Sequence, residues 1–143
     1  MKKSASMPLL LSTLLVLILT QACATTLQPV ATTSTVLFTE GSRQHTAMLL
    51  VALPPQDVYA GLVRIIEGEP GLMIINREDE RYFIEAEKDG KQIAGQASDL
   101  GHGETLLFLW ADAGDTGDTG ADINRRAVNR ICDELKVKCE VKN

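Results

Sequence analysis

The chain has 143 residues, of which 45% are hydrophobic, 23% charged and 4% aromatic, and its 19 acidic side chains outnumber 14 basic ones. This length suits one domain, and the composition excludes a disordered or collagen-like chain. A net charge of −5 argues against a general nucleic-acid binder, because that function needs clustered Lys and Arg to displace counterions from phosphates.

The amino terminus has the pattern of a secretion signal. Lys2 and Lys3 precede an apolar block over Leu9–Leu19. As a helix this block would be about 16 Å long, roughly half the thickness of a bilayer core, so it is too short to span a membrane. A short positive segment followed by such a block is typical of a signal peptide.

The end of this block, Leu19-Thr20-Gln21-Ala22-Cys23, resembles the lipobox of bacterial lipoproteins, in which a small residue precedes an invariant cysteine. The resemblance implies that residues 1–22 are a signal peptide and that Cys23 is acylated and becomes the new amino terminus. The family usually has Leu three places before the cysteine, where this sequence has Thr20. A second interpretation stays open, because Ala22-Cys23-Ala24 also fits an ordinary signal peptidase site. Cleavage after Ala24 would release a soluble periplasmic protein.

The residues after Cys23 predict how the protein is held. Enterobacterial lipoproteins retained in the inner membrane have Asp directly after the cysteine, and this chain has Ala24. The resemblance therefore implies an outer-membrane lipoprotein that faces the periplasm, with a lipid bilayer as its partner through acylated Cys23. Each buried CH₂ group contributes about 0.8 kcal/mol, so two or three acyl chains hold a soluble domain at a bilayer. Residues 23–35 are interpreted as the lipidated Cys and a Thr-rich tether, which reaches about 40 Å when stretched.

The predicted domain, residues 36–143, begins with strands. Val36-Leu37-Phe38 forms a short strand and His45–Leu53 a longer one, which ends at Pro54-Pro55 because proline supplies no N–H to a ladder. Over Gln56–Glu67 the apolar residues recur every three or four positions. This spacing predicts an amphipathic helix that ends near Gly68 and Pro70.

Four apolar runs divided by turn signals follow and predict strands. These runs are Leu72–Asn76, Tyr82–Glu87, Gln92–Ala97 and Thr105–Ala111. The last is apolar on both faces, which predicts a central strand or one covered on both sides. A loop rich in Asp and Gly then leads into a second predicted helix over Ala121–Leu135, and Val137–Val141 is a candidate for a last edge strand.

These elements predict an α+β fold in the order β-β-α-β-β-β-β-α. An antiparallel meander of about four to six strands is covered on one face by the two helices. The order, behind a lipobox, is similar to several families of small, largely uncharacterised bacterial envelope lipoproteins. The resemblance covers about residues 45–135 and rests on segments such as PPQDVYAGLVRIIE, NREDER and FIEAE. It implies no known enzymatic activity.

Cysteine usage predicts one bridge. If Cys23 is lipidated or cut away, Cys132 and Cys139 remain, and the expected compartment is oxidising. A disulfide between them would close a small loop and join the carboxyl-terminal segment to the last helical turn, contributing at most about 2–3 kcal/mol. Two free thiols are the alternative, and the spacing C-x₆-C does not match the C-x-x-C of thioredoxin-like enzymes.

An acidic, glycine-rich segment is the weak candidate for metal binding. It contains Asp112, Asp115, Asp118 and Asp122. Ca²⁺ takes six to eight oxygen ligands, but the spacing matches neither the EF-hand nor the calcium-binding β-roll. We interpret the segment as a loop in which Asp118, Thr119 or Asp122 caps the second helix, with cation binding as the alternative.

No motif predicts catalytic residues or a cofactor. His102 lies in a glycine-rich turn and His45 has no evident partner, while no G-x-S-x-G elbow or phosphate loop occurs. The leading hypothesis is therefore a non-enzymatic, membrane-anchored envelope protein. A partner protein would dock on the sheet face left free by the helices or add a strand to the last edge strand. An envelope hydrolase using His102 and distant acids, and a Ca²⁺-dependent binder, are the alternatives.

Overall fold

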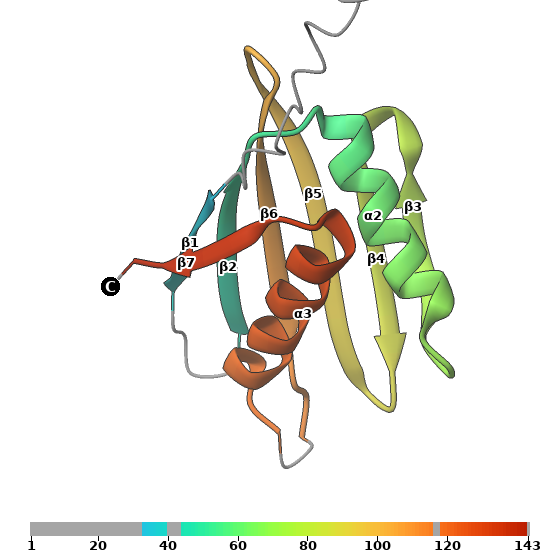
Figure 1. Cartoon of the computed structure of the whole chain (residues 1–143). Coiled ribbons are helices and arrows are strands. Elements are labelled where there is room, and N and C mark those ends of the chain that lie inside the picture. The colour runs from blue at the N-terminus through green and yellow to red at the C-terminus, as the bar shows by residue number, and fades with distance from the viewer. Residues whose placement is uncertain (1–32, 40–43, 116–117, 143) are drawn as a thin grey trace, which may run out of the picture. The chain divides into compact units, whose positions relative to one another are not determined.

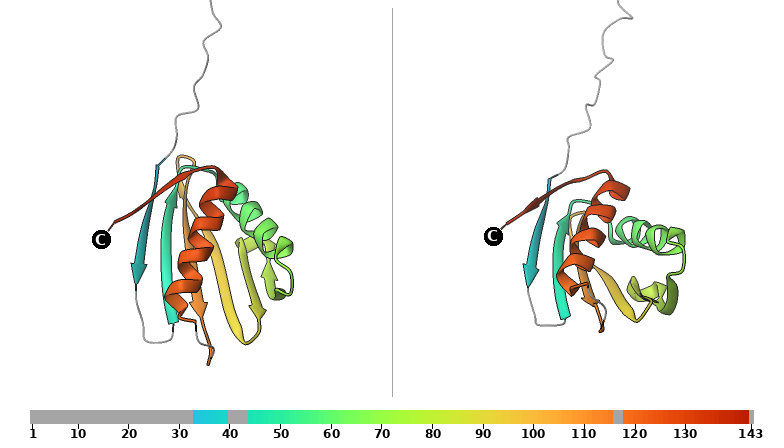
Figure 2. Two further views of the ribbon diagram at one scale, coloured as in Figure 1. Left: turned by 60° about the horizontal axis from the view of Figure 1, so that its bottom comes forward. Right: turned by 90° about the horizontal axis from the view of Figure 1, so that it is seen from below.

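One sheet runs through the computed structural model, which describes residues 33–39, 44–115 and 118–142. Two helices, α2 (Pro55–Gly68) and α3 (Gly120–Leu135), pack on the same face of this sheet (Figures 1 and 2). The strands are β1 (Thr33–Thr39), β2 (Gln44–Val51), β3 (Met73–Glu78), β4 (Phe83–Lys88), β5 (Lys91–Gly101), β6 (Glu104–Asp112) and β7 (Lys138–Val141), with a short 3₁₀ turn, η1 (Asp79–Arg81), between β3 and β4. The predicted signal peptide, Cys23 and most of the predicted tether lie outside the described residues.

The strand order in the sheet is β3-β4-β5-β6-β2-β1-β7. All neighbours are antiparallel except β1 and β7, which are parallel. After α2 the chain forms β3 at the edge of the sheet farthest from β1. The strands β4, β5 and β6 follow side by side, and β6 pairs with β2. After α3 the chain adds β7 beside β1 (Figure 1).

The α+β class is confirmed, but three finer predictions are wrong. The sheet has seven strands rather than four to six and is mixed rather than an antiparallel meander. The element order also differs, because β7 follows α3. A meander requires each strand to pair with its predecessor. This holds for β1 and β2 and from β3 to β6, but β3 does not pair with β2 and β7 does not pair with β6. The free edges of β2 and β1 are instead filled by segments distant in sequence.

Buried and more exposed side chains alternate along the central strands, so one face of the sheet is turned to the core and the other away from it. In β6 the side chains of Leu107, Leu109 and Ala111 are fully buried, and in β2 those of Ala47 and Leu49 are fully buried. Register places Leu49 beside Leu107 and Ala47 beside Leu109, so the core of the domain lies between these strands and the helices. The prediction that Thr105–Ala111 is central is confirmed, whereas only one of its faces is covered by described residues.

The two helices follow from their sequences. Pro55 occupies the first turn of α2, where a missing N–H has no cost, and Val58, Leu62 and Ile66 bury one face. At the start of α3 the Thr119 hydroxyl accepts a hydrogen bond from the backbone N–H of Asp122 at 3.1 Å. This confirms a cap in the predicted place, with Thr119 as the capping residue.

No helix among the described residues is long and apolar enough to cross a membrane.

Candidate binding surface

The sheet face opposite the helices, here called the open face, is apolar at its centre. Register pairs Leu50 with Leu106 and Met48 with Phe108, and alternation turns all four side chains away from the core. Leu50 and Phe108 each remain 39% exposed, and Leu37 on β1 is 45% exposed. Neither helix covers this face (Figure 2). Contiguous exposed apolar surface of this kind marks interaction sites.

In the middle of the sheet the charged side chains on this face all have one sign. By register, the open-face residues of β2 and β5 are uncharged, and the charged ones of β4 and β6 are all acidic: Glu85, Glu87, Glu104 and Asp112. Among the described residues none forms an ion pair with Glu85, Glu87 or Glu104. The open face therefore combines an apolar centre with carboxylates that carry uncompensated charge.

A hollow of about 310 Å³ lies within the open face. Two cross-strand rows form it, because Phe83, Gln96 and Phe108 are in register across β4, β5 and β6, and so are Glu85, Ala94 and Trp110. The small Ala94 side chain leaves space between its larger neighbours. The chain has one Trp and three Phe, and the Trp and two of the Phe line this hollow.

A second cavity, of about 350 Å³, lies between α2, α3 and the β4–β5 hairpin. Its walls are apolar and include Ile65, Ile93 and Ile123. Basic side chains stand at its mouth in two ion-paired groups, Lys88 and Arg130 with Glu69, and Lys91 and Arg126 with Asp118.

These ion pairs change the titration of the shared carboxylates. Arg130, then Lys88, lowers the pKa of Glu69 by hydrogen bonding and charge. Lys91, with a smaller effect from Arg126, lowers the pKa of Asp118. The cations at this mouth are thus engaged with carboxylates of the chain itself, unlike the free acids of the open face. We interpret the groups as ties between the two helices and the hairpin.

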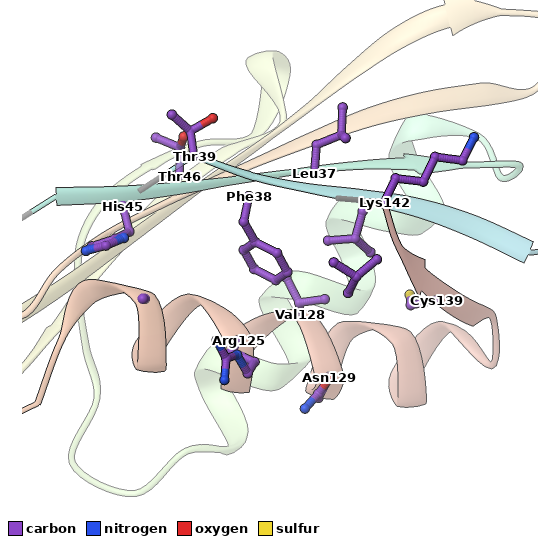
Figure 3. Close-up of a pocket in the computed structure, with 13 residues that line it drawn as sticks. Leu37, Phe38, Thr39, His45, Thr46, Arg125, Val128, Asn129, Cys139 and Lys142 are labelled. Carbon is purple, nitrogen blue, oxygen red and sulfur yellow. The ribbon is translucent and has the colours of Figure 1, made fainter. Parts of the chain in front are cut away.

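A third hollow, of about 600 Å³, lies between α3 and the strands β1, β2 and β7 (Figure 3). Phe38 points toward α3, near Val128, whereas Leu37 points to the other side of the strands. The Lys142 ammonium also lies on the side away from α3, which carries Arg125. The basic groups around this hollow do not converge, so it has volume without a defined polar site.

The two histidines lie far apart in the sheet. His45 is buried near one end of β2, where its carbonyl oxygen accepts a 2.6 Å hydrogen bond from Asn124 Nδ2. His102 is exposed in the β5–β6 turn at the other end of the strands, with φ at +57°. The length of β6 separates them by about 25 Å. No arrangement of His102 with a nucleophile emerges among the described residues.

The aspartates of the acidic segment bind different partners and do not come together at one point. Asp112 ends β6 and accepts a hydrogen bond from the Gly114 N–H at 2.8 Å, Asp118 pairs with Lys91, and Asp122 accepts one from the Thr119 hydroxyl at 2.8 Å. Among the described residues no group of three or more His, Cys, Asp or Glu side chains is placed to hold a metal ion. Asp115 lies in the same loop, beside the residues that the structure does not describe.

Cys132 and Cys139 are joined by a disulfide, with Cα atoms 6.2 Å apart. The bond ties the last turn of α3 to β7, the strand that pairs with β1. Cys23, the predicted lipidation site, lies outside the described residues.

No family model and no curated protein matches the chain. Among solved structures it is similar to a conserved protein of unknown function, EF2215 from Enterococcus faecalis, with 13% identity and a TM-score of 0.47 over 69% of this chain and 73% of that one. It is also similar to Ara h 8.0201, with 11% identity and a TM-score of 0.47 over 65% and 96% of the two chains. The Zhui aromatase/cyclase from Streptomcyes sp. R1128 matches with 16% identity and a TM-score of 0.38 over 66% and 86%. Similarities at this level identify neither a family nor an activity.

No local sequence motif predicts the aromatic hollow. Phe83, Ala94 and Trp110 are separated by many residues and share no local motif. One signal was present, because Phe108 and Trp110 alternate on the side of the strand away from the buried Leu107 and Leu109. Large aromatic residues on the non-core side of a strand predict a second contact surface.

Proposed function

We propose that the chain is a lipid-anchored protein of the bacterial envelope, at the outer membrane and facing the periplasm, with a non-enzymatic role. In this role the open face binds a partner protein. One observation carries the proposal: the open face is apolar at its centre, and the charged groups that β4 and β6 add to it are all acidic and largely unpaired. The anchor is supported by the lipobox-like residues that end at Cys23.

The chemistry of the open face specifies the partner. Leu50, Leu106 and Phe108 need an apolar surface against them, because their burial supplies the main driving force for association. Glu85 and Glu87 then favour Lys or Arg on the partner beside that surface, since complementary charges steer and align a complex. An anionic bilayer surface would be repelled by the same carboxylates. The proposed occupant is therefore a protein with an apolar patch flanked by basic residues.

The docking proposal can be tested with a site-specific photo-crosslinking residue in the full chain, expressed in a bacterium that lipidates it. Placed at Leu50, the crosslinker should give one discrete adduct. Placed at Arg64, which is exposed on α2 on the opposite side of the sheet, it should not give that adduct. Phe108→Glu should abolish the Leu50 adduct, because a charge replaces part of the apolar centre.

Mass spectrometry of the adduct then decides the partner's chemistry. A crosslinked peptide that is apolar and flanked by Lys or Arg supports the proposal. An acidic peptide, a peptide from a second copy of this chain, or equal adducts from both positions would contradict it.

The anchor has its own experiment. Radiolabelled palmitate should be incorporated by the wild-type chain and not by Cys23→Ala. A wild type without label would favour cleavage after Ala24 and a soluble periplasmic protein.

A further inference from the structure

We propose that the hollow between Glu85 and Trp110 receives an arginine side chain of the partner protein. This inference rests on the proposed docking function and specifies its central contact.

The strand register sets the dimensions of this site. Glu85 and Trp110 occupy the same cross-strand row on either side of Ala94. Neighbouring strands lie about 4.8 Å apart, so the Cα atoms of Glu85 and Trp110 are separated by roughly 10 Å across the small Ala94 side chain. The space above Ala94 forms part of the hollow of about 310 Å³. A side chain entering it from the partner would have the indole on one side and the carboxylate on the other.

The lining of the hollow selects a cation. An indole attracts a cation through its π system, and Trp is the most favourable aromatic side chain for this contact. Glu85 supplies a formal negative charge that is not engaged in an ion pair with any described residue. Phe83 and Phe108, in the adjacent row, add apolar walls to the same space. A cation seated between them would lose part of its contact with solvent, and both contacts strengthen when less solvent screens them.

Arginine fits this lining better than lysine. Its guanidinium is planar, stacks on aromatic rings and is more weakly hydrated than an ammonium group. It can donate two hydrogen bonds to one carboxylate such as that of Glu85 while one face lies on a ring. The amide oxygen of Gln96, in the neighbouring row, is a further acceptor within the lining. Arginine and tryptophan are also the residues that most often dominate binding energy at interfaces.

The protein's own cations do not compete for the site. Lys88 and Lys91, at the ends of the strands that carry Glu85 and Ala94, face the helices and pair there with Glu69 and Asp118. The charges that face Trp110 from β4, β5 and β2 are therefore acidic or absent among the described residues.

Trp110 also provides the measurement, because it is the only tryptophan of the chain. The full chain, purified in detergent, is titrated with the blocked peptide acetyl-Leu-Arg-Leu-amide while the indole fluorescence is recorded. The matched probe contains citrulline, which has the shape of arginine without its charge. We expect a saturable change with the arginine peptide at millimolar concentration, and binding of the citrulline peptide at least tenfold weaker.

Two variants locate the response. Glu85→Gln removes the charge and keeps the shape, and should weaken arginine-peptide binding about three- to tenfold. The matched control Asp133→Asn removes a carboxylate charge from the exposed side of α3, across the domain from the hollow, and should bind as the wild type does. Trp110→Leu, measured by calorimetry and first checked for a folded circular dichroism spectrum, should lose binding.

The outcomes separate this inference from the proposed function. Equal responses to both peptides, or unchanged binding in Glu85→Gln, would overturn the arginine site. If the Leu50 crosslink nevertheless forms with an apolar, basic-flanked peptide, docking on the open face stands without it. If no such crosslink forms, the docking proposal itself is wrong, whatever the peptides do.

Discussion

At the residue scale, Tyr59 links α2 to the β3–β4 edge of the sheet. Its hydroxyl donates a 2.6 Å hydrogen bond to Asp79 Oδ1 and lies 3.3 Å from the carbonyl oxygen of Phe83. Arg77 in turn binds Asp79 at 2.7 Å and lowers the pKa of that carboxyl. Burial, together with the charge of Asp79, raises the pKa of Tyr59 to about 12 from its ordinary value of 10.0.

This shift predicts a loss of stability at alkaline pH. The folded state holds the Tyr59 proton more tightly than the unfolded state, so the stabilisation is complete below about pH 10 and is lost as the pH rises through about 12. Tyr59→Phe should lower the free energy of unfolding at pH 8 by about 1 kcal/mol and lose less than the wild type between pH 8 and 11. Urea unfolding followed by Trp110 fluorescence measures both. Tyr82→Phe keeps the Tyr59 hydroxyl and should retain the wild-type pH dependence; parallel curves for wild type and Tyr59→Phe would contradict the assignment.

At the element scale, α2 approaches the sheet at Gly95. A Cβ atom at this position would lie 2.3 Å from Leu62 Cδ2 and 3.2 Å from Leu109 Cδ2. Gly95→Ala should therefore destabilise the protein by about 1–3 kcal/mol, since an overpacked core must shift side chains or backbone. Gly68→Ala, at the end of α2, meets nothing within 4 Å and should be neutral or slightly stabilising. Thermal unfolding of the two variants compares them directly, and equal melting temperatures would contradict this packing.

The disulfide between Cys132 and Cys139 joins the elements α3 and β7. Cys132 and Cys139 should resist alkylation before reduction and react afterwards, as measured by mass spectrometry of the mature protein. Because β7 contributes only Lys138–Val141 to the sheet, the disulfide is expected to retain this short strand beside β1. Alkylation of both residues before reduction would remove the bridge.

At the scale of the whole molecule, charge is separated between the two sides of the sheet. The basic residues of the β4–β5 hairpin and of α3 gather on the helix side around Glu69 and Asp118. On the open face β4 and β6 contribute only acids, whereas the basic Lys138 and Lys142 lie at the β1–β7 edge, where Lys138 pairs with Glu140. The acids of β4 and β6 are the reason why the proposed partner is expected to be basic where it meets this part of the open face.

The ion pairs of Asp118 also bear on the hypothesis that the acidic segment binds Ca²⁺. Asp118 already binds Lys91 at 2.6 Å and Arg126 at 3.5 Å, and Asp122 lies at the first turn of α3. Adding Ca²⁺ should therefore leave the melting temperature unchanged, because a divalent cation would have to displace these cations. A rise that is lost in Asp115→Asn would restore the calcium-binding hypothesis.

The local elements could be predicted from the sequence. The spacing of Val58, Leu62 and Ile66 defines the buried side of α2, and the alternation around Leu107 and Leu109 defines β6, because both patterns come from neighbours along the chain. The cap of α3 was predictable for the same reason, since Thr119 and Asp122 are one helical turn apart.

Which strands pair is visible only in the folded chain. Pairing of β6 with β2 and of β7 with β1 depends on which free edge a distant segment reaches, and alternation along one strand carries no information about its neighbour. The row of Glu85, Ala94 and Trp110 arises from that register alone. The candidate site was therefore outside the reach of sequence patterns, because its chemistry comes from three strands that contribute one side chain each.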